Sequence, residues 1–248
     1  MTTHAAAGKH WTEPELEGLT VENHFRLRGL EVTRLDTFVD AAFAFVLTLL
    51  VISFDEIPSN IPEMLAAIKR IPGFAASFAV LMWFWLQHRL WSRRYGLENR
   101  STVLHSLAFI FVVMVYVYPL RMVFEGMFSN LTDGFLATSY QIESYNDLRI
   151  IFVFYSVGFF AMSLLISRLF IMARRSAAAL ALNDIELRKT NVQIRIWLLA
   201  AAGGLLSIVL SVTLPDAWVP AAGYMYFGLF PLMRIPVFLD LRRNARAT

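Results

Sequence analysis

Six long apolar stretches, separated by short polar segments, dominate the pattern of hydrophobic and polar positions along the chain. They run over residues 36–54, 71–91, 103–124, 148–173, 194–214 and 218–239. Each is close to or above the ~20 residues that an α-helix needs to cross ~30 Å of hydrocarbon. The pattern predicts an all-α bundle of six membrane-spanning helices. Only Pro215, Asp216 and their neighbours separate the last two stretches, so these also fit one hairpin or a re-entrant pair. Pro231 and Pro236 interrupt the final helix near its end.

The polar segments divide the chain into a cytoplasmic N-terminal segment over residues 1–35, a channel-like membrane domain over 36–239 and a cytoplasmic tail over 240–248. Residues 1–23 are small, polar and acidic and predict a mobile tail with room for a short helix. We expect a separate interfacial helix over 58–70, an outer loop over 126–147 and a cytoplasmic helical extension over 176–193. Ser59, and either Asn183 or Asp184, are the expected helix caps.

Composition and charge agree with a membrane protein. Hydrophobic residues make up 57% of the chain and charged residues 17%, whereas soluble domains contain about 25% charged residues. Of the 22 lysines and arginines, 18 fall in the N-terminal segment, between spans two and three, between spans four and five, or after span six. The other four fall on the opposite side. Because positive charge accumulates in the cytoplasm, both termini are predicted to be cytoplasmic.

Three charged residues head the first apolar stretch. Arg34, Asp36 and Asp40 precede a run that is otherwise lipid-soluble. A charge at membrane depth costs at least ~2.5 kcal/mol, so such groups usually face a bundle interior or a water-filled path. The simpler interpretation is that they mark the water-facing end of the helix. That interpretation suits Asp40 less well, because Asp40 lies a full turn deeper than Asp36.

Two histidines fall at the same predicted membrane level as Asp40. His88 closes the second span and His105 opens the third, so Asp40, His88, His105 and Arg34 are predicted to form one polar cluster that joins three helices. The chain contains no cysteine and no His-Glu-x-x-His spacing, so we expect no metal site. It also lacks a nucleophile elbow, a phosphate-binding loop and other catalytic motifs, so no catalytic residues, no enzyme activity and no resident cofactor are predicted. Arg121 and Glu125, one turn apart, are expected to pair.

A known family shares the motif at the first span. The pattern Arg34-x-x-x-Phe38-x-Asp40, followed by Ala44-Phe45 and Thr48-Leu49-Leu50, resembles the Arg-x-x-x-Phe-Ser-Asp signature of the lysosomal potassium channel called transmembrane protein one-seven-five. Residues 84–90, with Trp85, His88 and Arg89, resemble the second-helix pattern of its bacterial relatives. The match is specific over spans one to three.

The resemblance implies a homotetramer in the bacterial inner membrane, with a central pore lined by the first helix of each subunit. It places a hydrophobic constriction at Phe45, with Leu49 and Ile52 further outward, and a role in cation selection at Thr48. It assigns Arg34, Phe38, Asp40 and His88 to a polar network that holds the pore helix. His105 stands about where an asparagine is common in the relatives. Potassium, or another monovalent cation, would be the permeant ion. The other expected partners are membrane lipid and further copies of the chain, and no nucleic acid is expected.

Two departures from the family pattern keep other functions open. Val39 replaces the signature serine, and Phe45 stands where the relatives carry isoleucine or leucine. Both favour a non-conducting scaffold or sensor with the channel architecture. A proton-coupled transporter, with Asp40 and His88 as a proton relay, is a further alternative. Transporters usually contain helices broken near the middle of the membrane, whereas the proline breaks here lie near the ends. A potassium-selective channel with a hydrophobic gate is the function we expect.

Overall fold

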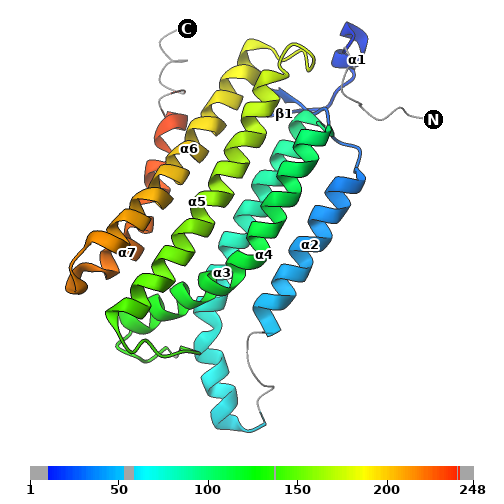
Figure 1. The fold of residues 1–248 in the computed structure, drawn as a ribbon. Helices are drawn as coiled ribbons and strands as arrows, with labels where there is room; N and C mark the ends of the chain where they lie inside the picture. The colour runs from blue at the N-terminus through cyan, green and yellow to red at the C-terminus, as the bar shows by residue number, and fades with distance from the viewer. Residues whose placement is uncertain (1–10, 53–58, 137, 239, 241–248) are drawn as a thin grey trace.

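Four long helices form the centre of the molecule in the computed structural model, which describes residues 11–52, 59–136, 138–238 and 240. They are α3 (Ile61–Tyr95), α4 (Arg100–Leu131), α5 (Tyr145–Arg175) and α6 (Asp184–Thr213). Short connections join them, so that each runs antiparallel to the next, and they lie side by side (Figure 1). All four are long and apolar enough to cross a membrane. The expected all-α class of a multi-pass membrane protein is confirmed.

The first and last predicted spans lie at the edges of this bundle. Helix α2 (Arg34–Ile52) packs against α3 and α4, and α7 (Pro220–Leu232) packs against α6 and α5 (Figure 1). Helix α2 has 19 residues and approaches the ~20 needed to span a membrane. Helix α7 has only 13, because Pro231 lacks a backbone N–H and the helix ends at Leu232. A short 3₁₀ turn, Asp216–Trp218, joins α6 to α7. Six complete spans therefore stay a prediction.

Two connections differ from their predicted form. The expected interfacial helix over 58–70 is not separate, because α3 continues from Ile61 through Pro72 to Tyr95, with Asn60 rather than Ser59 as its cap. Residues 61–70 form an extension beyond the bundle (Figure 1). The expected extension over 176–193 is also wrong in part. Helix α5 ends at Arg175, turns follow, and Asn183 caps α6 by accepting a hydrogen bond from the backbone N–H of Glu186.

The N-terminal segment contains ordered structure at one end of the bundle. A short helix, α1 (Glu13–Glu17), precedes a two-stranded antiparallel hairpin of β1 (Val21–Glu22) and β2 (Phe25–Arg26). Asn23 and His24 form its turn with positive φ angles of 51° and 56°, as a tight hairpin turn requires. The predicted short helix in the tail is present. The rest of this segment was predicted to be mobile, but α1 and the hairpin occupy most of residues 13–26. Residues 1–10 lie outside the described part.

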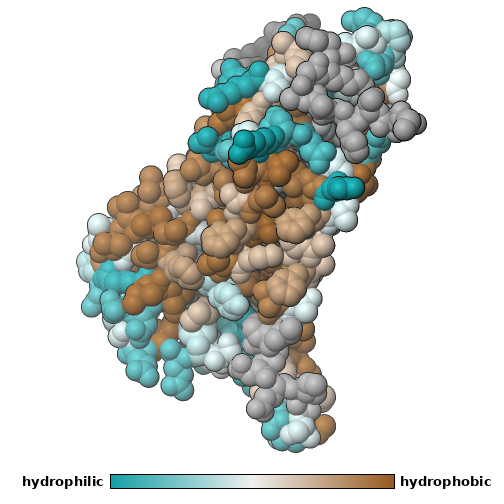
Figure 2. All heavy atoms as spheres, turned by 45° about the vertical axis from the view of Figure 1, so that its right-hand side comes forward, coloured by the Kyte–Doolittle hydropathy of each residue, from teal (hydrophilic) through white to brown (hydrophobic). Residues whose placement is uncertain are grey.

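Aromatic side chains fill the core, and apolar residues cover its outside. The ring of Phe84 is fully buried and lies 5.4 Å from Trp197 and 5.8 Å from Phe159 between ring centroids. Figure 2 shows a broad hydrophobic band across the middle of the face in view, with hydrophilic residues gathered toward the two ends. A soluble protein does not normally expose such a band. The chain is therefore an integral membrane protein.

Candidate functional site

Helix α2 has one covered face and one uncovered face. Its covered face packs into the core through six buried residues, namely Leu35, Val39, Ala42, Phe43, Val46 and Leu50. Its uncovered face consists of exposed residues at steps of three and four, namely Arg34, Thr37, Phe38, Ala41, Ala44, Phe45, Thr48 and Val51. We call these eight residues the open face of α2. It carries an arginine and two hydroxyl groups, which is unusual for a surface in contact with lipid.

Two of the four residues predicted to form the constriction and the selectivity site, Phe45 and Thr48, lie on the open face. Phe45 is 54% exposed, and Phe38, two turns earlier, is 53% exposed. The hydroxyl of Thr48 donates a hydrogen bond to the carbonyl of Ala44 at 3.0 Å. Leu49 is only partly exposed and packs against the core, so it lies at the border of the open face rather than on it. The side chain of Ile52, the last residue of α2, lies outside the described part.

Asp36 fixes the start of α2. Its carboxylate accepts hydrogen bonds from the backbone N–H and the hydroxyl of Thr33, at 3.1 and 3.0 Å, and its own N–H donates to the Thr33 hydroxyl. This reciprocal pair is a helix cap. The Ser92 hydroxyl of α3 donates to the same carboxylate at 2.5 Å. Asp36 therefore lies at the helix end, which agrees with the simpler interpretation that the charged residues mark that end. Its hydrogen bond with Ser92 also connects the end of α2 to α3.

Asp40 and His88 point to different partners. The indole N–H of Trp85 donates to the Asp40 carboxylate at 2.7 Å, at the edge of the open face. His88 is buried, shares a hydrogen bond of 2.9 Å with the Ser106 hydroxyl of α4, and stacks on Phe109 with ring centroids 5.8 Å apart. Both residues line one hollow of about 280 Å³ between α2 and α3.

Arg34 and His105 do not line that hollow. His105 Nδ1 hydrogen-bonds the carbonyl of Ser101 at 2.7 Å, and its Nε2 accepts from Arg168 of α5 at 3.2 Å. His105 and Ser106 are neighbours on α4, so their side chains point about 100° apart, and only Ser106 faces His88. The predicted single cluster is therefore replaced by separate contacts. Val39, where the signature has serine, also lines the hollow and is buried.

Sequence reasoning missed the hydrogen-bonded group that precedes α2. The Glu186 carboxylate of α6 accepts from the guanidinium groups of Arg26 at 3.0 Å and Arg28 at 2.9 Å. The Arg28 side chain is fully buried and also donates to the carbonyl of Leu180 at 2.7 Å. The hydrogen bond to Glu186 raises the pKa of the Arg26 guanidinium. The one sequence signal was the alternation of aromatic, basic and apolar residues over 25–28.

The hairpin also holds the chain just before α2. The N–H groups of Arg28 and Gly29 donate to the carbonyls of Arg94 and Arg93, at 3.4 and 3.0 Å. Phe25 is fully buried against Tyr95, with ring centroids 5.5 Å apart. The segment from Phe25 to Gly29 thus bridges the ends of α3 and α6 before α2 begins. Within the described ranges, no group of three or more His, Asp or Glu side chains is arranged to hold a metal ion.

Comparison with known proteins places these features in a family. Residues 34–119, which include the open face, match the family described as endosomal/lysosomal potassium channel TMEM175. A potassium channel from Marivirga tractuosa is 33% identical over 222 residues, which cover 85% of this chain and 88% of that protein.

The fold has a solved relative as well. The crystal structure of the potassium channel MtTMEM175, a threonine-to-alanine variant in complex with a nanobody fused to MBP, superimposes with a TM-score of 0.76. The two chains are 28% identical, and the match covers 90% of this chain and 99% of that one. These relatives are potassium channels rather than enzymes. Residues 34–119 match the family, a potassium channel is 33% identical over 85% of the chain, and the fold matches a solved member. The chain therefore belongs to the TMEM175 potassium channel family.

Proposed function

We propose that this chain is a subunit of a potassium-conducting channel whose pore is lined by α2. The observation that carries the proposal is the open face of α2, which brings Phe38, Phe45 and Thr48 to one uncovered surface. An arginine and hydroxyl groups on a lipid-facing surface would be costly, whereas they are well placed beside a water-filled path. The names of the relatives, both potassium channels, support the same function.

A pore of this kind needs several copies of the chain. Helix α2 lies at the edge of one bundle, so a single bundle cannot surround its open face (Figure 1). We propose a homotetramer in which four open faces enclose a central path. Closed cyclic assemblies of identical subunits are the usual form of such oligomers. The described contacts of α2 with α3 and α4 leave the open face free for this role.

The proposed gate is a ring of Phe45 side chains, one from each subunit. Apolar constrictions close a pore by excluding water, and polar oxygens beside them then favour a partly dehydrated cation. Thr48 lies one turn beyond Phe45 on the open face. Its hydroxyl proton is engaged with the Ala44 carbonyl, so its oxygen lone pairs are available to a cation in the pore.

The charge distribution supports a cytoplasmic location for the hairpin end. Helices α3 and α5 both end there, with Arg93 and Arg94 in the last turn of one and Arg174 and Arg175 in the last turn of the other. Basic residues concentrate on the cytoplasmic side of membrane proteins. We propose that both termini lie on that side, in the inner membrane of a bacterial cell.

Potassium flux from liposomes tests the proposed pore. We expect Phe45→Ala to raise the flux well above that of the unchanged chain, because a wider and less apolar ring keeps the path hydrated. Phe111→Ala is the matched control, because Phe111 is 68% exposed on α4 and does not belong to the open face. Equal flux from the unchanged chain and from well-folded Phe45→Ala would refute the gate.

A non-conducting scaffold or sensor is the second candidate. The exposure of both Phe38 and Phe45 on the open face favours it, since two phenylalanine rings from each subunit would plug a narrow path. Flux only from Phe45→Ala, or only from a double variant that also truncates Phe38, would instead mean a channel that phenylalanine plugs at rest. Absence of flux in all variants, from a protein that still assembles as a tetramer, would favour the scaffold.

A further inference from the structure

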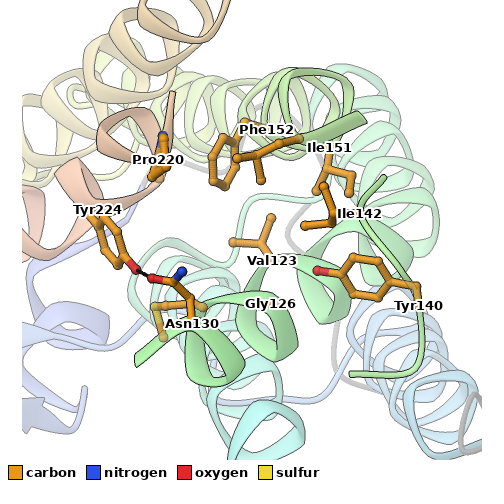
Figure 3. Close-up of a pocket in the computed structure, with 12 residues that line it drawn as sticks. Val123, Gly126, Asn130, Tyr140, Ile142, Ile151, Phe152, Pro220 and Tyr224 are labelled. Atoms are coloured by element: carbon orange, nitrogen blue, oxygen red, sulfur yellow. Dashed lines mark hydrogen bonds between the residues drawn. The ribbon is translucent and has the colours of Figure 1, made fainter. Parts of the chain in front are cut away.

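A small apolar cavity lies at the end of the bundle opposite the hairpin. It has a volume of about 120 Å³ and is enclosed by α4, α5, α7 and the segment 140–142 (Figure 3). Most of its wall is apolar, formed by Val123, Met127, Leu148, Ile151, Phe152 and Pro220. An engineered apolar cavity of ~150 Å³ binds a single benzene ring, so this cavity has room for about one small ring.

Two aromatic rings, those of Phe152 and Tyr140, form part of the cavity wall. A Cβ atom added to Gly223 would lie 2.7 Å from the Phe152 ring, and one added to Gly126 would collide with the Tyr140 hydroxyl. The two glycines therefore let these rings approach the helix backbones closely. The Tyr140 hydroxyl also donates to the carbonyl of Met122, which holds the ring in place. The cavity is thus a built feature of the fold rather than a gap beside flexible side chains.

The opening of the cavity is polar and acidic. At its rim the Tyr224 hydroxyl donates to Asn130 Oδ1 at 2.8 Å (Figure 3). Beyond the rim lies a wider hollow of about 590 Å³ that shares Gly126, Asn130, Tyr140 and Ile142 with the cavity and adds the carboxylates of Asp133 and Glu143. Among the residues that line the two hollows, all from the described ranges, none is a lysine or arginine.

We propose that this paired site binds a small amphiphile made of one aromatic ring and an ammonium group. The ring occupies the apolar cavity, and the ammonium group lies in the acidic hollow near Asp133 and Glu143. The volume limits the apolar part to about one ring, and the two carboxylates without a lining cation give the site its charge preference. No residue of α2 lines either hollow, so this inference does not depend on the proposed pore.

Binding of three ring compounds of the same size tests the proposal. The probes are 4-fluorobenzylamine, 4-fluorobenzyl alcohol and 4-fluorobenzoate, followed by ¹⁹F NMR with the full chain in nanodiscs of uncharged lipid. We expect saturable binding of the amine, binding of the alcohol about fivefold weaker, and no saturable binding of the benzoate, because each exposed charge pair contributes at most ~1 kcal/mol. Equal binding of amine and benzoate would overturn the assigned ligand class.

Variants locate the site. Val123→Phe places a ring in the cavity and should weaken amine binding at least tenfold, whereas Val115→Phe, two turns earlier on the exposed side of α4, should leave it unchanged. If Val123→Phe does not fold, Ile142→Trp closes the opening from the connecting segment. Asp133→Asn combined with Glu143→Gln should remove the preference for the amine and keep alcohol binding. Full amine binding by folded Val123→Phe or Ile142→Trp, as expected for a cation held in the pore, would overturn the proposal.

Discussion

Glu186 shows how one buried carboxylate can determine where the N-terminal segment lies. Its side chain is fully buried, accepts hydrogen bonds from Arg26 and Arg28, and belongs to the cap of α6. Such a group is costly to bury alone, and the two guanidinium groups offset that cost. The Arg28 side chain has the same dependence, because its partners are Glu186 and backbone carbonyls.

Glu186→Ala should therefore destabilise the protein by ~3–5 kcal/mol, since it leaves the buried Arg28 charge without a counter-charge. The midpoint of unfolding by denaturant, followed by tryptophan fluorescence, measures the loss. Glu22→Ala is the control. Glu22 pairs with Arg93 at 2.9 Å with both side chains partly exposed, so its removal should cost less than ~1 kcal/mol. Equal losses in the two variants would contradict the assigned role of Glu186.

Residue chemistry was predictable from the sequence where partners are close along the chain. The Arg121–Glu125 pair, one turn apart, is confirmed at 2.7 Å and is buried. Asp36 and the cap at Asn183 are similar cases. The partner of Asp40 was not predictable, because Trp85 lies 45 residues away and resembles an interfacial belt residue. The rotation of each helix about its axis decides such contacts, and a single sequence does not specify that rotation.

At the scale of elements, the hairpin connects the ends of the long helices to the start of α2. Gly29 lies where the chain crosses the end of α3. A Cβ atom there would collide with the carbonyl oxygen of Ser92 and lie 2.8 Å from Gly96 Cα. The crossing therefore depends on the absence of a side chain at this position.

Gly29→Ala should separate the chain from the end of α3 and cost ~1–3 kcal/mol, as overpacking does. The shift in melting temperature of the purified protein tests this. Gly228→Ala in α7 is the matched control, because a Cβ atom there meets no atom within 4 Å, and it should cause no loss. If Gly29→Ala melts at the temperature of the unchanged chain, the crossing is not tight in solution.

Helices were more predictable than their connections. The apolar stretches located α2 to α6, because twenty apolar residues give a strong signal. The hairpin gave almost none, since each strand has two residues and its docking depends on residues about 160 positions away. The sequence predicts a separate interfacial helix over 58–70, whereas α3 continues from Ile61 through Pro72 to Tyr95. A proline inside a helix removes one hydrogen bond but need not end the helix.

For the whole molecule, the position of α2 matters most. The central helices cover one another, whereas α2 is covered on one side only. Phe45 and Thr48, to which the family resemblance assigns the constriction and cation selection, both lie on the open face. Leu49 lies at its border, since a four-residue step turns the helix by ~40° and carries Leu49 past Phe45 toward the covered side. Periodicity describes a single helix and does not reveal what faces the open side.

Single cysteines on α2 can show what the open face meets, because the chain contains no cysteine of its own. Ala41 is exposed on the open face and its neighbour Ala42 is buried, so Ala41→Cys and Ala42→Cys are closely matched variants. If the open face lines a water-filled pore, a charged methanethiosulfonate reagent should modify the cysteine at position 41 quickly and reduce potassium flux. The cysteine at position 42 should stay unmodified, because the core excludes the reagent.

The same test at Ala44, one turn deeper, should give slower modification than at Ala41. Resistance of Ala41→Cys to the charged reagent, together with modification by a membrane-soluble maleimide, would mean that the open face meets lipid and that the pore lies elsewhere.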